Sequence, residues 1–141
     1  MISVVIPHYN SPEQLARVVD AVRAQDIADE VEIIIADDGS DHVPDVPGAT
    51  VVTQEDHGFR AAAARNLGAS HARGEILAFL DGDTVPEPGY LAASTRQIKA
   101  DPRAVVVGTR LTGPERTEPQ WLIDAWRTTR HLSSPDDTSW R

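Results

Sequence analysis

Two carboxylates separated by one glycine follow a short apolar run in the stretch FLDGDT, residues 79–84. Asp81 and Asp83 can direct oxygen atoms at one ion, or at an ion and a hydroxyl group, and Gly82 allows a ligand to approach the backbone. Carboxylate oxygens suit Mg²⁺ or Mn²⁺, which proteins often bind through one or two carboxylates together with substrate phosphates. An Asp-Gly pair is also common in solvated turns, so the tripeptide alone leaves both interpretations open.

Two further polar segments, HYN (8–10) and DDGS (37–40), also follow apolar runs. DDGS suits a turn that caps a following helix, or a carboxylate that accepts from a base N–H or from ribose hydroxyls. In HYN, Asn10 can fix a turn and Tyr9 can belong to the core. We expect His8 to be a solvated or turn residue and not a catalyst.

Basic side chains lie in and around an alanine-rich stretch, GFRAAAARNLGASHARG, that predicts a helix over 58–74. Arg60 and Arg65 are about 140° apart around such a helix, so we expect different roles for them. Arg60 lies in the first turn, where it can meet a base or phosphates, and Arg65 can pair with an acid. We expect His71 and Arg73 to interact with the helix dipole, and Gly74 to end the helix.

The elements that must position these residues alternate between strands and helices, as in a mostly parallel sheet. Ser11 and Gln14 predict a capping box at the start of the first helix, with Pro12 in its first turn. The continuous apolar run at 75–80 predicts a strand covered on both faces. Predicted strands span 2–7, 31–36, 50–54, 75–80 and 104–110, and the predicted helices after the first span 58–74, 86–100 and 120–132.

The buried side of the first helix is predicted by an apolar stripe at helical spacing, Leu15, Val18, Val19 and Val22. Parallel strands end at the same edge of a sheet, and ligands of such sheets bind at this edge. HYN, DDGS and DGD each follow a predicted strand. The sequence therefore predicts a site where these three strand ends meet.

Composition limits the possible environments and partners. The chain has 141 residues, of which 40% are hydrophobic, so it can form one domain with a real core. It has no cysteine, which excludes disulfides and thiolate metal sites. Apolar runs of about five residues are far shorter than a membrane span needs. MISVVIPHYN shows no signal-peptide pattern, so we expect a cytoplasmic protein.

The net charge of −9 is concentrated in residues 1–95, which carry 16 acids and five bases. This acidity argues against a nucleic-acid partner, because such binding depends on Lys and Arg. It permits a phosphorylated ligand when a divalent cation supplies the positive charge.

Four stretches resemble, in order and spacing, the nucleotide-sugar-binding half of family 2 glycosyltransferases. They are SVVIPHYN, IIIADDGS, GFRAAAARNLGA and GEILAFLDGDTVPEPGYL, which together extend over residues 1–91, with a weaker continuation through VVVGTR. GFRAAAARNLG and GTR are most similar to polysaccharide-polymerising members of the chondroitin polymerase kind. The resemblance implies an α/β, Rossmann-like GT-A fold of the nucleotide-diphospho-sugar transferases, with a mostly parallel sheet and helices on both faces.

The resemblance also implies roles for individual residues. Asp38 would accept a hydrogen bond from the uracil N–H, Asp37 would support its loop, and Arg60 would lie near the base and the phosphates. Asp81 would meet the ribose, and Asp83, with Asp81 beside it, would bind Mn²⁺ or Mg²⁺ bridging the diphosphate. The implied donor site consists of Pro7, His8, Tyr9, Asp37, Asp38, Arg60, Asp81, Gly82 and Asp83, where the segment 7–9 holds uracil largely through its backbone.

The implied function is metal-dependent binding of a UDP-sugar for inverting transfer of the sugar to a hydroxyl of a sugar, polysaccharide or lipid-linked acceptor. The sequence departs from the family twice. His8 stands where the family often has threonine, which a backbone contact tolerates. The Glu-Asp motif that carries the family's catalytic base has no counterpart after Asp83.

We therefore expect a truncated chain with little transfer activity. Residues 1–110 would form the nucleotide-sugar-binding domain, and 111–141 would begin the acceptor region, with a helix at about 120–132 and then a polar tail. The truncated face around Trp121 and Trp126 would favour self-association.

Three alternatives remain from the sequence. The first is a non-catalytic nucleotide-sugar-binding module or inactive fragment. The second is a sugar-nucleotide-synthesising enzyme, which needs a glycine-rich, basic loop that PHYNSPEQ lacks. The third is a structural interaction domain, which the placement of three polar motifs at strand ends disfavours.

Overall fold

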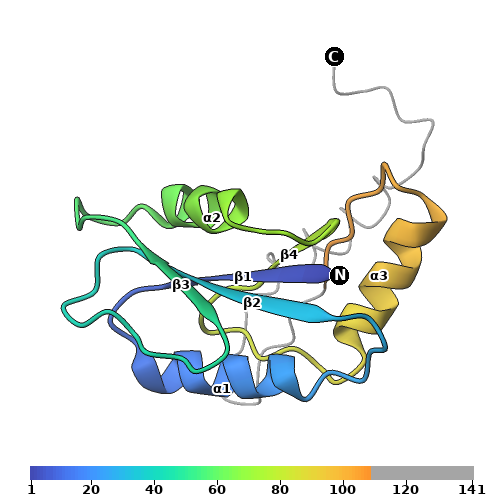
Figure 1. Ribbon diagram of the computed structural model, residues 1–141, viewed down its shortest axis with the longest axis horizontal. Coiled ribbons are helices and arrows are strands. Elements are labelled where there is room, and N and C mark those ends of the chain that lie inside the picture. Colours follow the sequence, from blue (N-terminus) through green and yellow to red (C-terminus); the bar gives the residue numbers. More distant parts are fainter. Residues whose placement is uncertain (109–141) are drawn as a thin grey trace, which may run out of the picture. The chain divides into compact units, whose positions relative to one another are not determined.

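The computed structural model describes residues 1–108, in which four parallel strands form one sheet with helices on both faces (Figure 1). The strand order is β3-β2-β1-β4, so β1 pairs with β2 on one side and with β4 on the other. This arrangement confirms the predicted α/β class and the parallel sheet. The strands are β1 (Ile2–His8), β2 (Val31–Asp37), β3 (Thr50–Thr53) and β4 (Ile76–Phe79), and the helices are α1 (Pro12–Arg23), α2 (Ala61–Ser70) and α3 (Tyr90–Ala100).

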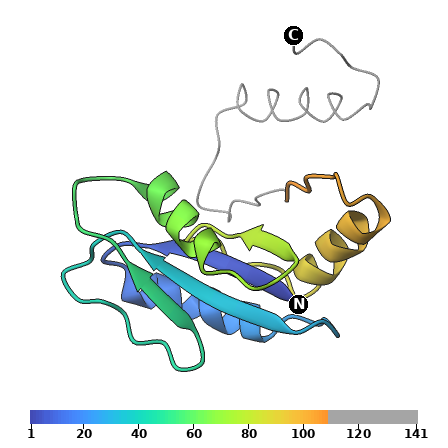
Figure 2. The same cartoon turned by 45° about the horizontal axis from the view of Figure 1, so that its top comes forward.

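The two faces of the sheet are covered by different helices (Figures 1 and 2). Side chains of β1 alternate between them, because successive residues of a strand point to opposite faces. Val4 and Ile6 pack with α1 and α3, whereas Val5 packs with Ala64 of α2. The predicted apolar stripe of α1 is buried as expected, at Leu15, Val18, Val19 and Val22.

The start of α1 differs in one respect from the prediction. Pro12 is the first helical residue, but the Ser11 side chain makes no capping hydrogen bond, so the predicted capping box is wrong. Ser11 has φ −133° and ψ 60°, which is not the extended conformation of a typical N-cap. Its carbonyl still accepts the first hydrogen bond of the helix, from Leu15 N at 3.0 Å.

Helix α2 is shorter than the predicted 58–74: it begins after Arg60 and ends at Ser70. Arg60, the residue directly before the helix, donates from its backbone N to the Asp38 carboxylate at 2.8 Å. Gly74 does not end the helix but passes close to β1, where a Cβ atom would lie 2.6 Å from Ser3 N. Gly68 lets α2 approach the sheet closely, since a Cβ there would lie 2.5 Å from Val5 Cγ1.

Within residues 1–108, helices do not cover both faces of strand β4, contrary to the expectation from its apolar run. Leu77 and Phe79 lie on the same face as Val5 and remain 42% and 46% exposed. The ten residues of α2 pack on β1 and β2 through Gly68, and they leave this face of β4 open. Within residues 1–108, no helix is both long and apolar enough to cross a membrane.

The predicted fifth strand, 104–110, is wrong where the structure describes it. Residues 104–108 form no strand, and Val105 and Val107 are 88% and 85% exposed. Alternating apolar residues make a strand only when a neighbouring strand pairs with them. The predicted helix at 120–132, the tail, Trp121 and Trp126 lie outside the described residues.

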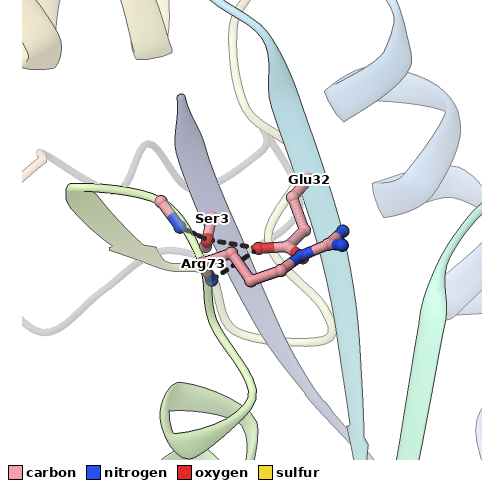
Figure 3. A network of polar contacts seen from close by, with 4 residues as sticks. Ser3, Glu32 and Arg73 are labelled. Atoms are coloured by element: carbon pink, nitrogen blue, oxygen red, sulfur yellow. Dashed lines mark hydrogen bonds and ion pairs between the residues drawn. The ribbon is translucent and has the colours of Figure 1, made fainter.

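A polar network fixes the start of β4 at the amino end of the sheet (Figure 3). Ser3 Oγ donates to Glu32 Oε2 at 2.6 Å, and Arg73 donates to the same carboxylate from its backbone N at 3.0 Å and from Nε at 2.7 Å. Gly74 N donates to Ser3 Oγ at 2.8 Å. Arg73 thus pairs with β2 rather than acting on the helix dipole. The network joins β1, β2 and the segment that leads into β4.

This network makes stability depend on pH. Hydrogen bonds from Ser3 and Arg73 lower the pKa of Glu32 from 4.5 to about 2. A carboxyl group whose pKa is lower in the folded than in the unfolded protein stabilises the fold at pH values above its unfolded pKa. This stabilisation is lost as the pH falls towards its folded pKa. Glu32→Gln should therefore cost about 2 kcal/mol near neutral pH and progressively less between about pH 4.5 and pH 2. Urea unfolding of both proteins across this range measures the difference, and a constant difference would contradict the assignment.

Candidate functional site

The three polar segments predicted to meet do lie at one edge of the sheet. In the pairing of β1 with β2, His8 is opposite Asp37, so both strands end at the same level. The turn after β4 reaches this level too, because a Cβ on Gly82 would lie 2.6 Å from the carbonyl oxygen of Pro7. Only glycine permits this approach of two backbones. The structure thus brings residues 7–10, 37–40 and 81–83 together at the carboxyl edge.

Asp37 is fully buried and acts as an acceptor for its own loop. Ser40 donates to it from its backbone N at 3.1 Å and from Oγ at 2.5 Å, and Thr53 Oγ1 donates at 2.8 Å. These bonds close the turn 37–40 and tie it to β3. The turn interpretation of DDGS is therefore correct for Asp37, whereas the helix expected after Ser40 is absent from residues 41–49.

Asp38 connects the end of β2 to both ends of the segment 54–60. It is 4% exposed and accepts from the Gln54 side chain and, at 2.8 Å, from Arg60 N. Its own backbone N donates to the carbonyl of His8 at 2.8 Å. A carboxylate has about four lone-pair sites, so the two hydrogen bonds that the Asp38 side chain accepts from Gln54 and Arg60 leave capacity for another donor.

The segment 54–60 is held against the strand ends by Asp56, which the sequence did not single out. Asp56 accepts from Tyr9 Oη at 3.2 Å and from Gly58 N at 2.8 Å. Gly39 has φ +86°, and a Cβ on it would lie 2.5 Å from Asp56 N. The hydrogen bond to Asp56 raises the pKa of Tyr9. Tyr9 is 49% exposed, so it is not a core residue, and it presents its ring at the edge.

A reciprocal pair of bonds fixes the turn after β1 to the DDGS loop. Asn10 N donates to Ser40 Oγ at 2.9 Å, and Asp41 N donates to Asn10 Oδ1 at 3.0 Å. Asn10 has φ +44°, a conformation that asparagine tolerates better than most residues. The expectation that Asn10 fixes a turn is therefore correct.

His8 is buried rather than solvated, which corrects the sequence-based expectation. It is 5% exposed as the last residue of β1. Burial lowers the pKa of its imidazole, with the charge of Asp37 opposing the shift. The side chain is therefore mainly neutral near pH 7.

Arg60 reaches the edge directly before α2. Its Nη2 donates to the carbonyl of Glu55 at 2.9 Å. Its Nε is buried, and no acceptor within residues 1–108 forms a hydrogen bond with it. An unsatisfied buried donor is costly, so this N–H is suited to an acceptor that arrives with a ligand.

Asp81 and Asp83 are both exposed and belong to a tight turn in which Thr84 N donates to the carbonyl of Asp81 at 3.0 Å. Thr84 Oγ1 donates to Asp83 Oδ1 at 3.3 Å. Asp81 forms an ion pair with Arg65, whose Nη2 lies 2.5 Å from Asp81 Oδ1. The expected pairing of Arg65 with an acid is confirmed. The partner, however, is a residue of the candidate metal motif.

The carboxylates of Asp81 and Asp83 are suited to one kind of cation. Within residues 1–108, no three His, Cys, Asp or Glu side chains are grouped so that they could hold a metal ion by themselves. Two exposed carboxylates at a turn suit Mg²⁺ or Mn²⁺, which take their other ligands from phosphate and water. They do not suit a structural metal, which needs a closed set of protein ligands.

A hollow of about 340 Å³ lies elsewhere, between α3 and the segment that precedes β2. Its charged lining includes Asp29 and Lys99, which form an ion pair at 2.9 Å. Because Asp29 precedes β2, this hollow is at the amino end of the strands and is separate from the carboxyl edge.

Comparison with known sequences identifies a family. The sequence model of glycosyl transferase family 2 matches residues 3–138. Chondroitin synthase of Escherichia coli is 30% identical over 117 residues, which cover 77% of this chain and 17% of that protein. Validoxylamine A glucosyltransferase of Streptomyces hygroscopicus subsp. limoneus is 40% identical over 100 residues, which cover 64% of this chain and 22% of that protein. The chain thus spans about a fifth of the length of these two relatives.

Solved structures share the fold. S. aureus TarS 1-349 in complex with UDP-GlcNAc superposes with a TM-score of 0.61 at 23% identity, over 70% of this chain and 31% of that one. The mannosyltransferase PcManGT from Pyrobaculum calidifontis, in complex with GDP-Man and Mn²⁺, gives 0.57 at 27% identity, over 72% and 32%. These likenesses confirm the GT-A fold expected from the sequence.

The bonds to Asp37 predict a large effect of its removal on stability. Asp37→Ala leaves the donors of Ser40 and Thr53 without their acceptor at a buried position, and we expect a loss of about 3 kcal/mol. Asp41→Ala, at an exposed position of the same loop, should cost less than about 0.5 kcal/mol. Urea unfolding compares the two variants. Equal stabilities would contradict the proposed anchoring of the loop by Asp37.

Proposed function

This chain belongs to glycosyl transferase family 2, and we propose that its carboxyl edge binds the nucleotide diphosphate of a nucleotide-sugar donor, with the cation held at Asp81 and Asp83. The observation that carries the proposal is the convergence of three polar strand ends on this edge. Gly82 packs on Pro7 there, and Asp38 joins β2 to the segment that holds Arg60. Ligands of open parallel sheets bind at such an edge.

The base would lie against the segment 7–9 and Asp38. Tyr9 offers a half-exposed ring, and Asp38 has lone pairs for a base N–H in addition to its bonds with Gln54 and Arg60. Asp37 would act indirectly, because its bonds fix the loop that carries Asp38. Uracil is our choice of base from the family resemblance. TarS was solved with UDP and the mannosyltransferase with GDP-Man, so relatives of this fold take different bases.

The diphosphate would lie between the turn 81–83 and Arg60. The buried Nε of Arg60 provides a donor without a partner in the described residues, and phosphate oxygens are strong acceptors for it. Asp83 and Asp81 would hold Mn²⁺ or Mg²⁺ beside the diphosphate, and Asp81 would also reach the ribose. When bound, the cation neutralises negative charge that develops on the nucleotide diphosphate as it leaves the sugar.

The proposed reaction is inverting transfer of the sugar to a hydroxyl of a sugar, polysaccharide or lipid-linked acceptor. Such a transfer needs a carboxylate that removes the acceptor proton. Within residues 84–108, the acids are Glu87, in the loop before α3, and Asp101, directly after α3. Glu87 contacts Gln25 through its carbonyl, and Asp101 pairs with Arg103. The second candidate is a nucleotide-sugar-binding module that performs no transfer by itself.

The binding step can be tested by calorimetric titration of UDP into the full chain, with Mn²⁺ and then with EDTA. We expect binding with Mn²⁺ and a loss of at least about tenfold in affinity with EDTA or in Asp83→Asn, because Asp81 and Asp83 would hold the cation that offsets the charge of the diphosphate. Asp101→Asn removes a charge away from the site and should bind UDP normally. Binding that is equal with Mn²⁺ and EDTA would contradict the cation's role, and no binding at all would contradict the proposed function.

A further inference from the structure

We propose that Arg65 makes cation binding at Asp81 and Asp83 conditional on the nucleotide diphosphate. The inference rests on the proposed function and adds a positioning role for a residue that the donor site did not include. Its basis is the ion pair of 2.5 Å between Arg65 Nη2 and Asp81 Oδ1. The Asp81 carboxylate, which would help to bind the cation, therefore already has a positive partner.

Arg65 is held in this position by the packing of its helix. Gly68, one turn further along α2, lies so close to β1 and β2 that a Cβ would clash with Val5. The residue before the helix is fixed by the bond from Arg60 N to Asp38. The helix is therefore anchored on both sides of Arg65, and the guanidinium stays within reach of Asp81. The side chains of Arg65 and Asp81 are 33% and 53% exposed, so ligands can reach the pair.

The charge of Arg65 has opposite effects on a free cation and on a cation with a diphosphate. A divalent cation that approaches Asp81 alone meets the guanidinium, and like charges repel at short range. Within residues 1–108, no third carboxylate or imidazole joins the group to offset this repulsion. A diphosphate brings negative charge and strong acceptor oxygens, which can interact with the cation and with Arg65 at the same time.

The consequence is a thermodynamic coupling between the two ligands. Arg65 weakens the binding of the cation alone and strengthens the binding of the cation together with the nucleotide. Because coupling between two binding sites is reciprocal, the factor by which UDP tightens Mn²⁺ binding must equal the factor by which Mn²⁺ tightens UDP binding. The site would thus discriminate against free cations and load cation and nucleotide together.

The test measures Mn²⁺ binding by electron paramagnetic resonance and calorimetry, with and without UDP, in the full chain. In Arg65→Gln we expect free Mn²⁺ to bind about five- to tenfold tighter, and the tightening by UDP to shrink by at least about the same factor. Arg65→Lys keeps the charge and should resemble the wild type. Arg103→Gln removes an equally charged arginine from an exposed pair with Asp101 and should also resemble the wild type.

The outcomes separate this inference from the proposed function. If wild-type UDP and Mn²⁺ bind together and Arg65→Gln leaves their coupling unchanged, or weakens the binding of free Mn²⁺, the role of Arg65 is wrong while the donor site stands. If the wild type binds no UDP with Mn²⁺, both proposals are wrong. Circular dichroism and the urea midpoint show whether Arg65→Gln is folded. We expect Arg65→Gln to be folded, because the ion pair that it removes is partly exposed.

Discussion

The pairing of β1 with a parallel strand on each side is the constraint on which the rest of this structure depends. Its register places His8 opposite Asp37 on one side and Val5 opposite Phe79 on the other. After β4, Leu80 N still donates to Val5 O at 3.1 Å, and the next turn passes directly over Pro7. The three loops of the site therefore take their positions from one strand, and a shift in either register would separate the carboxylates of the turn 81–83 from the segment 7–9.

The site also shows how buried acids are tolerated at a strongly acidic edge. Asp37 and Asp38 are adjacent and almost fully buried, yet both accept hydrogen bonds from neutral amides and hydroxyls rather than from a cationic side chain. These hydrogen bonds satisfy buried carboxylate oxygens that would otherwise be costly to remove from water. Positive charge is supplied further out, by Arg60 and Arg65. The carboxylates of Asp81 and Asp83, in the turn after β4, are exposed to solvent at the same edge.

Much of the fold could be predicted from local sequence patterns. The apolar stripe of α1 and the polar ends of three strands were correctly identified, because burial and parallel topology follow from periodicity. The wrong capping box at Ser11 is a local error, whereas two other errors concern contacts between distant residues. The exposure of Leu77 and Phe79 on β4 depends on where α2 packs, and the strand expected at 104–110 depends on a neighbour that local sequence does not specify.

The same limit applies to the site. The acids of DDGS and DGD were recognisable from their position after apolar runs, and so was a pairing role for Arg65. Its partner Asp81 lies 16 residues away, and Asp56 lies 47 residues from Tyr9. No spacing rule connects such pairs. Burial of His8 could have been expected from the end of a buried strand, but its isolation in the sequence suggested a loop.

The most direct measurement of the central claim is an amide NMR spectrum of the full chain with UDP and a small amount of Mn²⁺, whose unpaired electrons broaden signals of nearby nuclei. We expect broadening of the amides of residues 81–84 and of 8–10, while those of Glu32, Arg73 and Lys99 at the amino end stay sharp. Broadening centred on the amino end, or none at the turn after β4 while UDP is bound, would contradict it.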